Sequence, residues 1–594
     1  MTVSALRLDP SQLPSGTRER FLFLFSTVCF IAGWQGLNFG PYLLNPQFFN
    51  TAVQLNLIVA AILLVITVSV FLYLTHTLRR VRLFGDTEIL DPASPVAARI
   101  GELARKIGVS VPRVVIDRNI FNVDAIAFGL PRRRSLLLGR GLLVVHAKRP
   151  PEFDVRIAHE LTHIKNGDVD LGHIARAMIQ TTKAVLLISC FIWLYVFGTW
   201  TVSVWRHSAM FGDDLSTFLT MYFPAAKAYL TLALLTFFWT IIFWIFLLTI
   251  EYKSFLRSRE HYADLGAANI VSTAFLALAI GDTARNPRAI LFDLYSAHPE
   301  ASTRLKVAID PITVLRPHLW YVVYLGLICG VVVSMLIVYY QLMQQTIAEF
   351  NAAGAFQEGL SYQDMLRDPA LRSVLNWQLL FYWIIFLPFL AALGSFGIRV
   401  CLGNLLTKNT FGKSIKEFVL QGLILVSFLG LGIKISPATI HNHVTLDQAT
   451  WKVHIAWTGF LPDSSIIFLL VLFIAYISTN LIFLIGLRRA VRGNRVTPPH
   501  FVWRLFIIAL WIYMYLQIAQ TVAVLLSFAV QADVLTFGDV SFRSLFLLVL
   551  GVFTIVLWVM LALVSYVVSR RGGTASGNFN RDRFAPWLYI PNRS

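Results

Sequence analysis

The sequence predicts a polytopic α-helical membrane protein that carries a small α+β domain on one side of the bilayer. Of its 594 residues, 57% are hydrophobic and only 14% are charged, a composition too apolar for a soluble protein. The apolar residues lie in blocks of about 20, the length that a helix needs to cross a bilayer. Two polar segments, 76–183 and 251–319, are long enough to fold outside the membrane.

The apolar blocks predict about ten transmembrane helices. Their approximate bounds are 21–44, 52–75, 184–205, 228–250, 320–343, 376–400, 417–435, 464–487, 505–530 and 544–569.

The charges of the connecting loops test this count. Loops rich in Lys and Arg alternate with loops that are poor in them: the arm 1–20 holds three, the loop 45–51 none, and the segment 251–319 eight. Positive loops stay in the cytoplasm. Because every loop follows the alternation, we expect an even number of spans, cytoplasmic termini and two cytoplasmic polar segments in the plasma membrane, as in a bacterial inner membrane.

The net charge of +18 does not indicate nucleic-acid binding, because the basic residues lie in short loops beside apolar blocks. That placement is typical of topology signals and of contact with anionic lipid. The expected partners are therefore the lipid bilayer and no nucleic acid. The four cysteines all lie inside apolar blocks and form no CxxC pair, so neither a disulfide framework nor a cysteine metal site is predicted.

The first polar segment predicts a compact set of helices and strands. Residues 92–108 read as an amphipathic helix with Pro95 near its start and Gly108 at its end. Residues 113–117 and 135–145 read as strands. The stretch "PPEFDVRIAHELTHIKNG" reads as a second helix, because paired prolines suit a first turn and a glycine suits a helix end.

This second helix holds a candidate metal site. His159 and His163 are four residues apart, so both imidazoles lie on one face and can bind one metal ion, by default zinc. Glu160 lies at the edge of that face, where its carboxylate can hold a water and take its proton. Such a pattern occurs by chance on the order of once in a hundred such chains. A third ligand is therefore needed for a firm prediction.

"SREHYADLGAAN" supplies that ligand. Glu260 can close the site, and Asp264, one helical turn later, can hydrogen-bond a ligand histidine and fix its tautomer. The alternative is a solvated helix face on which both carboxylates pair with Arg257 and Arg259.

"HELTHIKNGD", "SREHYAD" and "HPEASTR", in this order, make the chain resemble the M48 peptidases, integral-membrane zinc proteases of the HtpX and CAAX-prenyl endopeptidase types. The resemblance covers about residues 20–310 and implies a zincin-like fold with one zinc ion. It implies that His159, His163 and Glu260 bind the zinc, that Glu160 is catalytic and that Asp264 supports a ligand. His298 and Arg304 match a late motif at the active site. "NVDAIAFG" resembles the substrate-binding edge, which here comprises Asn122, Ala125, Ala127, Phe128 and Gly129.

The chain departs from this family in its length. Its four-span start resembles the HtpX type, and residues 320–594 add six predicted spans. We therefore expect four regions: an arm with two spans at 1–80, the peptidase domain with two spans at 81–318, a six-helix module at 319–571 and a tail at 572–594.

The leading hypothesis is a zinc metalloendopeptidase that cuts membrane or membrane-associated polypeptides at a cytoplasmic site, as in membrane protein quality control. The alternative is a non-catalytic receptor or scaffold with a protease-like domain. A transporter is disfavoured, because the later spans hold no ionisable residue near their centres. The sequence names no partner for the six-helix module.

Overall fold

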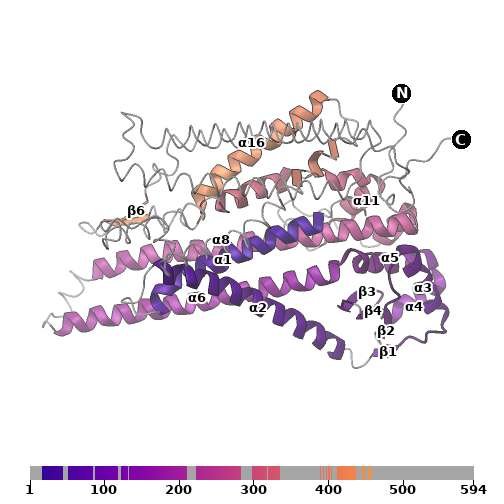
Figure 1. Ribbon diagram of the computed structural model, residues 1–594, viewed down its shortest axis with the longest axis horizontal. Helices are drawn as coiled ribbons and strands as arrows, with labels where there is room; N and C mark the ends of the chain where they lie inside the picture. The colour runs from indigo at the N-terminus through magenta and orange to yellow at the C-terminus, as the bar shows by residue number, and fades with distance from the viewer. Residues whose placement is uncertain are drawn as a thin grey trace, which may run out of the picture.

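A computed structural model shows a bundle of long helices with a small mixed domain at one end (Figure 1). The structure describes residues 16–43, 51–83, 87–117, 122–131, 133–210, 223–281, 298–317, 319–332, 411–436, 444–447 and 452–455, several residues between 388 and 404, and residues 334 and 480.

Four long helices form the frame of the described chain: α1 (Gly16–Leu43), α2 (Thr51–Leu83), α6 (Asp168–Met210) and α8 (Phe223–Ile270). α1 packs against each of the other three, and α6 also packs against α2 and α8. Their shared core is large and apolar, with Phe23, Trp244 and Leu247 almost fully buried. The outward faces of α2, α6 and α8 carry large exposed apolar side chains, as helices surrounded by lipid do.

Five helices in the described residues are long and apolar enough to cross a membrane: Leu57–Thr75, Asp168–Tyr195, Trp239–Ile270, Pro311–Val332 and Gly412–Ile435. They correspond to five of the predicted spans. The helix Asp168–Tyr195 corresponds to the predicted span 184–205, but it begins well before residue 184. The predicted span 21–44 is the helix α1, which is not among these five. The predicted spans 464–487, 505–530 and 544–569, and most of 376–400, lie outside the described residues, so the count of ten stays a prediction.

The small domain is built on a four-stranded mixed sheet with the order β1-β2-β4-β3. Its strands are β1 (Thr87–Ile89), β2 (Arg113–Asp117), β3 (Ala125–Leu130) and β4 (Arg133–Gly139). β2 and β4 are parallel, and β3 pairs antiparallel with β4. β3 therefore forms one edge of the sheet, so one side of its main chain is not paired with another strand.

Two helices of the domain follow the local sequence signals. α3 (Pro95–Ile107) begins where the Ser94 hydroxyl accepts a hydrogen bond from the Ala97 N–H, and it ends at Gly108, whose φ of 82° suits glycine. α5 (Pro150–Asn166) has prolines in its first turn and ends at Gly167 with a φ of 73°. Ile100, Phe153 and Leu161 from these helices are fully buried against the sheet. The predicted helices 92–108 and 150–167 are therefore confirmed.

The prediction of a continuous strand over 135–145 is wrong in its second half. β4 ends at Gly139, and residues Arg140–Lys148 form the helix α4. The change happens because Gly139 and Gly141 donate main-chain hydrogen bonds to the carbonyls of Asp124 and Asn122, 2.8 and 2.9 Å away. These bonds lead the chain away from the sheet, and Leu142 and Val145 then join the domain core from a helix.

The small domain and the long helices are joined without linkers. Gly167 alone separates α5 from α6. α8 runs unbroken through residue 250, where the fourth span was predicted to end, and continues as one helix to Ile270 in the small domain. Three shorter elements complete this part: α9 (Thr273–Gly281), α11 (Ala301–Ile309) and the 3₁₀ helix η4 (Pro311–Leu315).

The later part of the described chain packs against this frame. The helical segment 319–332 crosses α16 (Phe411–Ile435) closely, because Gly326 and Gly330 leave the α16 main chain room to approach. A Cβ at Gly326 would lie only 2.5 Å from the Leu425 carbonyl oxygen. This is the close packing that small residues four apart allow in membranes. A hairpin of β5 (Val444–Asp447) and β6 (Lys452–Ile455) follows α16.

Candidate metal centre

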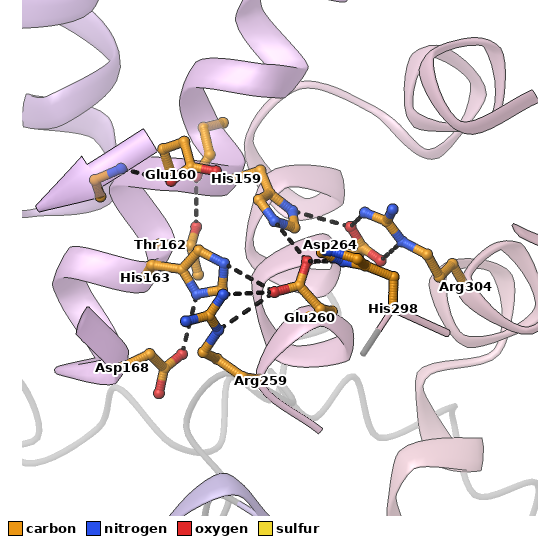
Figure 2. Close-up of polar contacts among 12 residues, drawn as sticks. His159, Glu160, Thr162, His163, Asp168, Arg259, Glu260, Asp264, His298 and Arg304 are labelled. Atoms are coloured by element: carbon orange, nitrogen blue, oxygen red, sulfur yellow. Dashed lines mark hydrogen bonds and ion pairs between the residues drawn. The ribbon is translucent and has the colours of Figure 1, made fainter. Parts of the chain in front are cut away.

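The two histidines of the HExxH motif lie at the junction of α5 and α8. Their rings project from the same face of α5, with centroids 4.8 Å apart and planes nearly perpendicular. Glu260 reaches them from α8, as Figure 2 shows. Its Oε2 lies 3.5 Å from His159 Nε2, and its Oε1 lies 3.6 Å from His163 Nε2. Both oxygens of one carboxylate therefore face two different imidazole nitrogens.

These distances suit a shared metal ion. Ligand atoms that surround zinc tetrahedrally at about 2.0–2.2 Å lie about 3.3–3.5 Å from one another. Two imidazoles and a carboxylate are also the donor types that zinc takes. His163 and Glu260 are almost fully buried, whereas His159 is partly exposed, so the site is open on the His159 side.

Glu160 offers a second carboxylate beside the histidines. His159, Glu160 and His163 each place one possible ligand atom within 4.8 Å of the others. The Glu160 Oε2, however, accepts a hydrogen bond from the main-chain N–H of Ala127, 2.8 Å away on β3. Glu260 contacts both imidazoles, which makes it the candidate for the third ligand position, and Glu160 lies between the site and the sheet edge.

Each histidine is held from behind by an aspartate. His159 Nδ1 lies 3.0 Å from Asp264 Oδ1, and Asp264 is fully buried. His163 Nδ1 lies 3.4 Å from Asp168 Oδ2 in the first turn of α6. An aspartate at Nδ1 keeps the proton there and leaves Nε2 free to bind a metal. Asp168 was not among the predicted site residues, although it lies five residues after His163 and directly follows the helix-ending Gly167.

The late motif supports the site through Asp264. Arg304, on α11, donates from Nε and Nη2 to the two oxygens of Asp264, at 2.7 and 2.6 Å. It therefore lies behind the ligands and contacts none of them. His298 has its Nδ1 3.5 Å from Glu260 Oε2, and its side chain is 71% exposed. The predicted residues His298 and Arg304 are thus both at the site, on its solvent side and its buried side respectively.

The charges around His159 favour a cation at this position. Burial lowers the pKa of the imidazole, but hydrogen bonds and attraction from Asp264 and Glu260 outweigh burial and raise the pKa to about 10. The two carboxylates that face the His159 ring stabilise a positive charge there. A proton on the ring can supply that charge, and so can a metal ion between the ring and Glu260.

Of the five predicted substrate-edge residues, Ala127 is the one whose main-chain N–H donates a hydrogen bond to Glu160 at the site. The Asn122 side chain donates to Asp117 and accepts from the Asp124 N–H, so it shapes the loop before β3. Phe128 is buried on the far face of the sheet with Val115 and Leu137. The Gly129 carbonyl accepts a hydrogen bond from Arg134, and Ala125 packs against the domain core.

A partly buried polar link ties this edge to the long apolar helices. Arg134 of β4 forms an ion pair with Asp170 of α6. Asp170 also accepts a hydrogen bond of 2.7 Å from the Tyr73 hydroxyl of α2. The strand edge therefore has a fixed position relative to two helices that are long and apolar enough to cross the bilayer.

Gly266 sets the spacing between the two ligand-bearing helices. A Cβ there would overlap the Thr162 methyl and lie 2.5 Å from its Oγ1, which donates to the Ala158 carbonyl. Gly266→Ala should therefore push α8 away from α5 and cost about 1–3 kcal/mol of stability, as overpacking does. Thermal unfolding in detergent measures this cost, and Thr162→Ala in the same chain should recover part of it.

Gly101→Ala is the matched control, because Gly101 is also helical and a Cβ there meets nothing within 4 Å. That substitution should stabilise α3 by about 0.5–1 kcal/mol. Equal effects of the two substitutions would show that the helix contact at Gly266 is not tight.

Comparisons with known proteins agree with this geometry. Residues 92–311 match the model of peptidase family M48. The chain is 30% identical over 173 residues to the protease HtpX of Baumannia cicadellinicola subsp. Homalodisca coagulata, covering 28% of this chain and 50% of that protein. It is 28% identical over 180 residues to a protease HtpX homolog of Thermococcus kodakarensis, covering 30% of this chain and 52% of that protein.

The chain thus spans about half the length of the curated relatives that it matches. No solved structure matches it. The matched residues hold the histidine pair, Glu260, Asp264, His298 and Arg304. Residues 92–311 of this chain are thus similar to peptidase family M48.

Proposed function

We propose that this protein is a zinc-dependent endopeptidase that cuts membrane or membrane-associated proteins at a site facing the cytoplasm. The observation that carries the proposal is the position of the Glu260 carboxylate, whose two oxygens lie 3.5 and 3.6 Å from the Nε2 atoms of His159 and His163. A cation shared by the three groups accounts for the approach of one carboxylate to two imidazole nitrogens.

The side chains of the candidate site have separate roles in this proposal. His159, His163 and Glu260 hold one zinc ion per chain, and Asp264 and Asp168 fix the orientation of the two imidazoles. When bound, zinc polarises the peptide carbonyl and makes water a better nucleophile at neutral pH. Glu160, next to the ligands and directed toward the strand edge, takes the proton of the attacking water and passes it to the leaving amine.

The substrate is expected to bind as an added strand beside β3. The Ala127 N–H points away from β4 and donates a hydrogen bond to Glu160. By contrast, the main-chain carbonyl of Asp124, three residues earlier, faces β4 and accepts a hydrogen bond from the Gly139 N–H. Alternate residues of an edge strand face outward, so Ala125 and Ala127 can pair with an extended peptide. Recognition through the main chain suits an enzyme that accepts many sequences.

Ala127→Pro tests this mode of binding. Proline removes the outward N–H but leaves the bonds between β3 and β4 in place, because it is tolerated on the free side of an edge strand. Losing one hydrogen bond of about 0.5–1.5 kcal/mol should raise KM about 2–13-fold for a peptide substrate. Steady-state kinetics measure the change. Ala127→Gly keeps the N–H and should stay near the wild-type KM; an equal rise in both variants would contradict strand addition.

The site is held at the membrane rather than on a free domain. α6 carries Asp168 and α8 carries Glu260, and both helices contain a candidate membrane span. The positive loops beside these spans favour the cytoplasmic side. Peptide bonds close to the bilayer therefore meet the site at a raised effective concentration, so we expect membrane-associated polypeptides as substrates.

Metal removal and side-specific labelling test the proposal together. The purified protein should contain one zinc ion per chain, and a chelator should abolish cleavage of an unfolded membrane protein until zinc is restored. In oriented vesicles, Ala301→Cys should react with an impermeant reagent only from the cytoplasmic side. Zinc binding without cleavage of any substrate would instead favour the receptor or scaffold, and labelling from outside would exclude a cytoplasmic site.

A further inference from the structure

A buried ion pair lies outside the residues that match the peptidase family. The Glu19 carboxylate, in the first turn of α1, accepts hydrogen bonds from Arg399 Nε at 2.7 Å and Nη2 at 2.9 Å. The Tyr321 hydroxyl donates to the same carboxylate at 2.7 Å. Glu19 and Arg399 are only 1% and 2% exposed. Two segments that lie 302 and 380 residues after Glu19 in sequence therefore meet at its carboxylate.

The same cluster touches α8 at three successive turns. Arg20 donates from Nη1 to the Ser254 carbonyl at 2.6 Å, and its guanidinium lies 4.7 Å over the Tyr321 ring. The Gly16 N–H donates to the Tyr262 hydroxyl at 3.0 Å. A Cβ at Gly16 would lie 2.7 Å from Arg399 Nη1 and 3.2 Å from Ser258 Oγ. The start of α1 is thus packed against both the Arg399 guanidinium and Ser258 of α8.

These contacts lie opposite the metal ligands on α8. Ser254, Ser258 and Tyr262 are four residues apart and share one face of the helix. Glu260 and Asp264 share another face, rotated by about 200° because they stand two residues further on. The turns that carry the third ligand are therefore held on one side by the histidines and on the other by the ion pair.

We propose that Arg399 is a positioning residue for the metal centre: paired with Glu19, it holds α8 so that Glu260 faces the two histidines. This inference rests on the proposed function for its meaning. Arg399 lies outside the range 92–311 that matches the family. The inference therefore gives a residue of the later part of the chain a role in positioning the metal centre. A displacement of the later helices would then move Glu260.

The test compares the full-length protein with Arg399→Lys and Glu19→Gln. Lysine keeps the charge but loses the paired N–H groups, and glutamine removes the carboxylate charge. Each variant should bind zinc about 2–30-fold more weakly, the range that follows from coupling energies across such networks. Hydrogen–deuterium exchange of residues 254–264 should become faster in both.

Phe418→Leu is the control, since Phe418 is fully buried on α16 and is not part of the ion-pair cluster. At a matched loss of melting temperature it should leave zinc affinity and the exchange of 254–264 unchanged. The inference is overturned if Arg399→Lys and Glu19→Gln leave both measurements at wild-type values, or if Phe418→Leu changes them equally. If the wild type binds no zinc, the proposed function fails, while the exchange comparison still decides the role of Arg399.

Discussion

Glu160→Gln is expected to bind zinc as the wild type does and to lose about 10²–10⁴ of its cleavage rate, the contribution of a general base. Glutamine has the shape of glutamate, and its amide oxygen can still accept from the Ala127 N–H. It cannot take a proton from water. The three groups that we assign as ligands are unchanged. Zinc content and kcat, measured on the same preparation, separate the two effects.

Glu152→Gln provides the comparison for Glu160→Gln. Glu152 lies on the same helix, two turns earlier, and pairs with Arg149 and Arg156 away from the metal centre. It should retain most of the wild-type rate. If Glu160→Gln kept more than about a tenth of the activity, a different group would have to serve as the base. A loss of zinc in that variant would instead make Glu160 a ligand.

Glu260→Ala is expected to remove zinc altogether at concentrations that saturate the wild type. Two histidines alone leave the ion without its only anionic ligand and without the group that spans both rings. An ion that binds only the folded protein stabilises it by an amount that grows with the logarithm of its concentration over Kd, about 2.7 kcal/mol at 100 times Kd. Adding zinc should therefore raise the melting temperature of the wild type but not that of Glu260→Ala.

Glu300→Ala is the control for this experiment. Glu300 precedes α11 close to His298, and it contacts no histidine of the HExxH motif in the described structure. Its zinc-dependent stabilisation should match that of the wild type. A full response in Glu260→Ala would reassign the third ligand to Glu160 or His298.

Local patterns were sufficient to predict the parts of the domain that carry the ligands. α3 begins at Pro95 and ends before Gly108, and α5 begins at its paired prolines and ends before Gly167. These limits were predictable because caps and fixed backbone angles act within a few residues. The spacing of His159 and His163 needs only the period of a helix. Glu260 was predicted because it lies four residues before Asp264, the same helical spacing as that of the two histidines. In the structure its carboxylate lies beside both imidazole rings.

Features that depend on distant contacts were not predictable in this way. The apolar run 135–145 reads equally well as strand or buried helix, and hydrogen bonds to Asn122 and Asp124 decide where β4 ends. Asn122 resembles a substrate residue in its motif, yet its side chain is used within the loop. The pairing of Glu19 with Arg399 spans 380 positions and leaves no local signal.

The single glycine between α5 and α6 has a consequence for how such an enzyme can be handled and regulated. With Gly167 as the only residue between α5 and α6, and with Glu260 on a helix that contains a candidate membrane span, no cut in the chain separates the proposed metal site from the long apolar helices. Limited proteolysis cannot shed a soluble active form, as it does for ectodomains joined by a stalk. Turnover of the whole chain is then the direct way for a cell to end its activity.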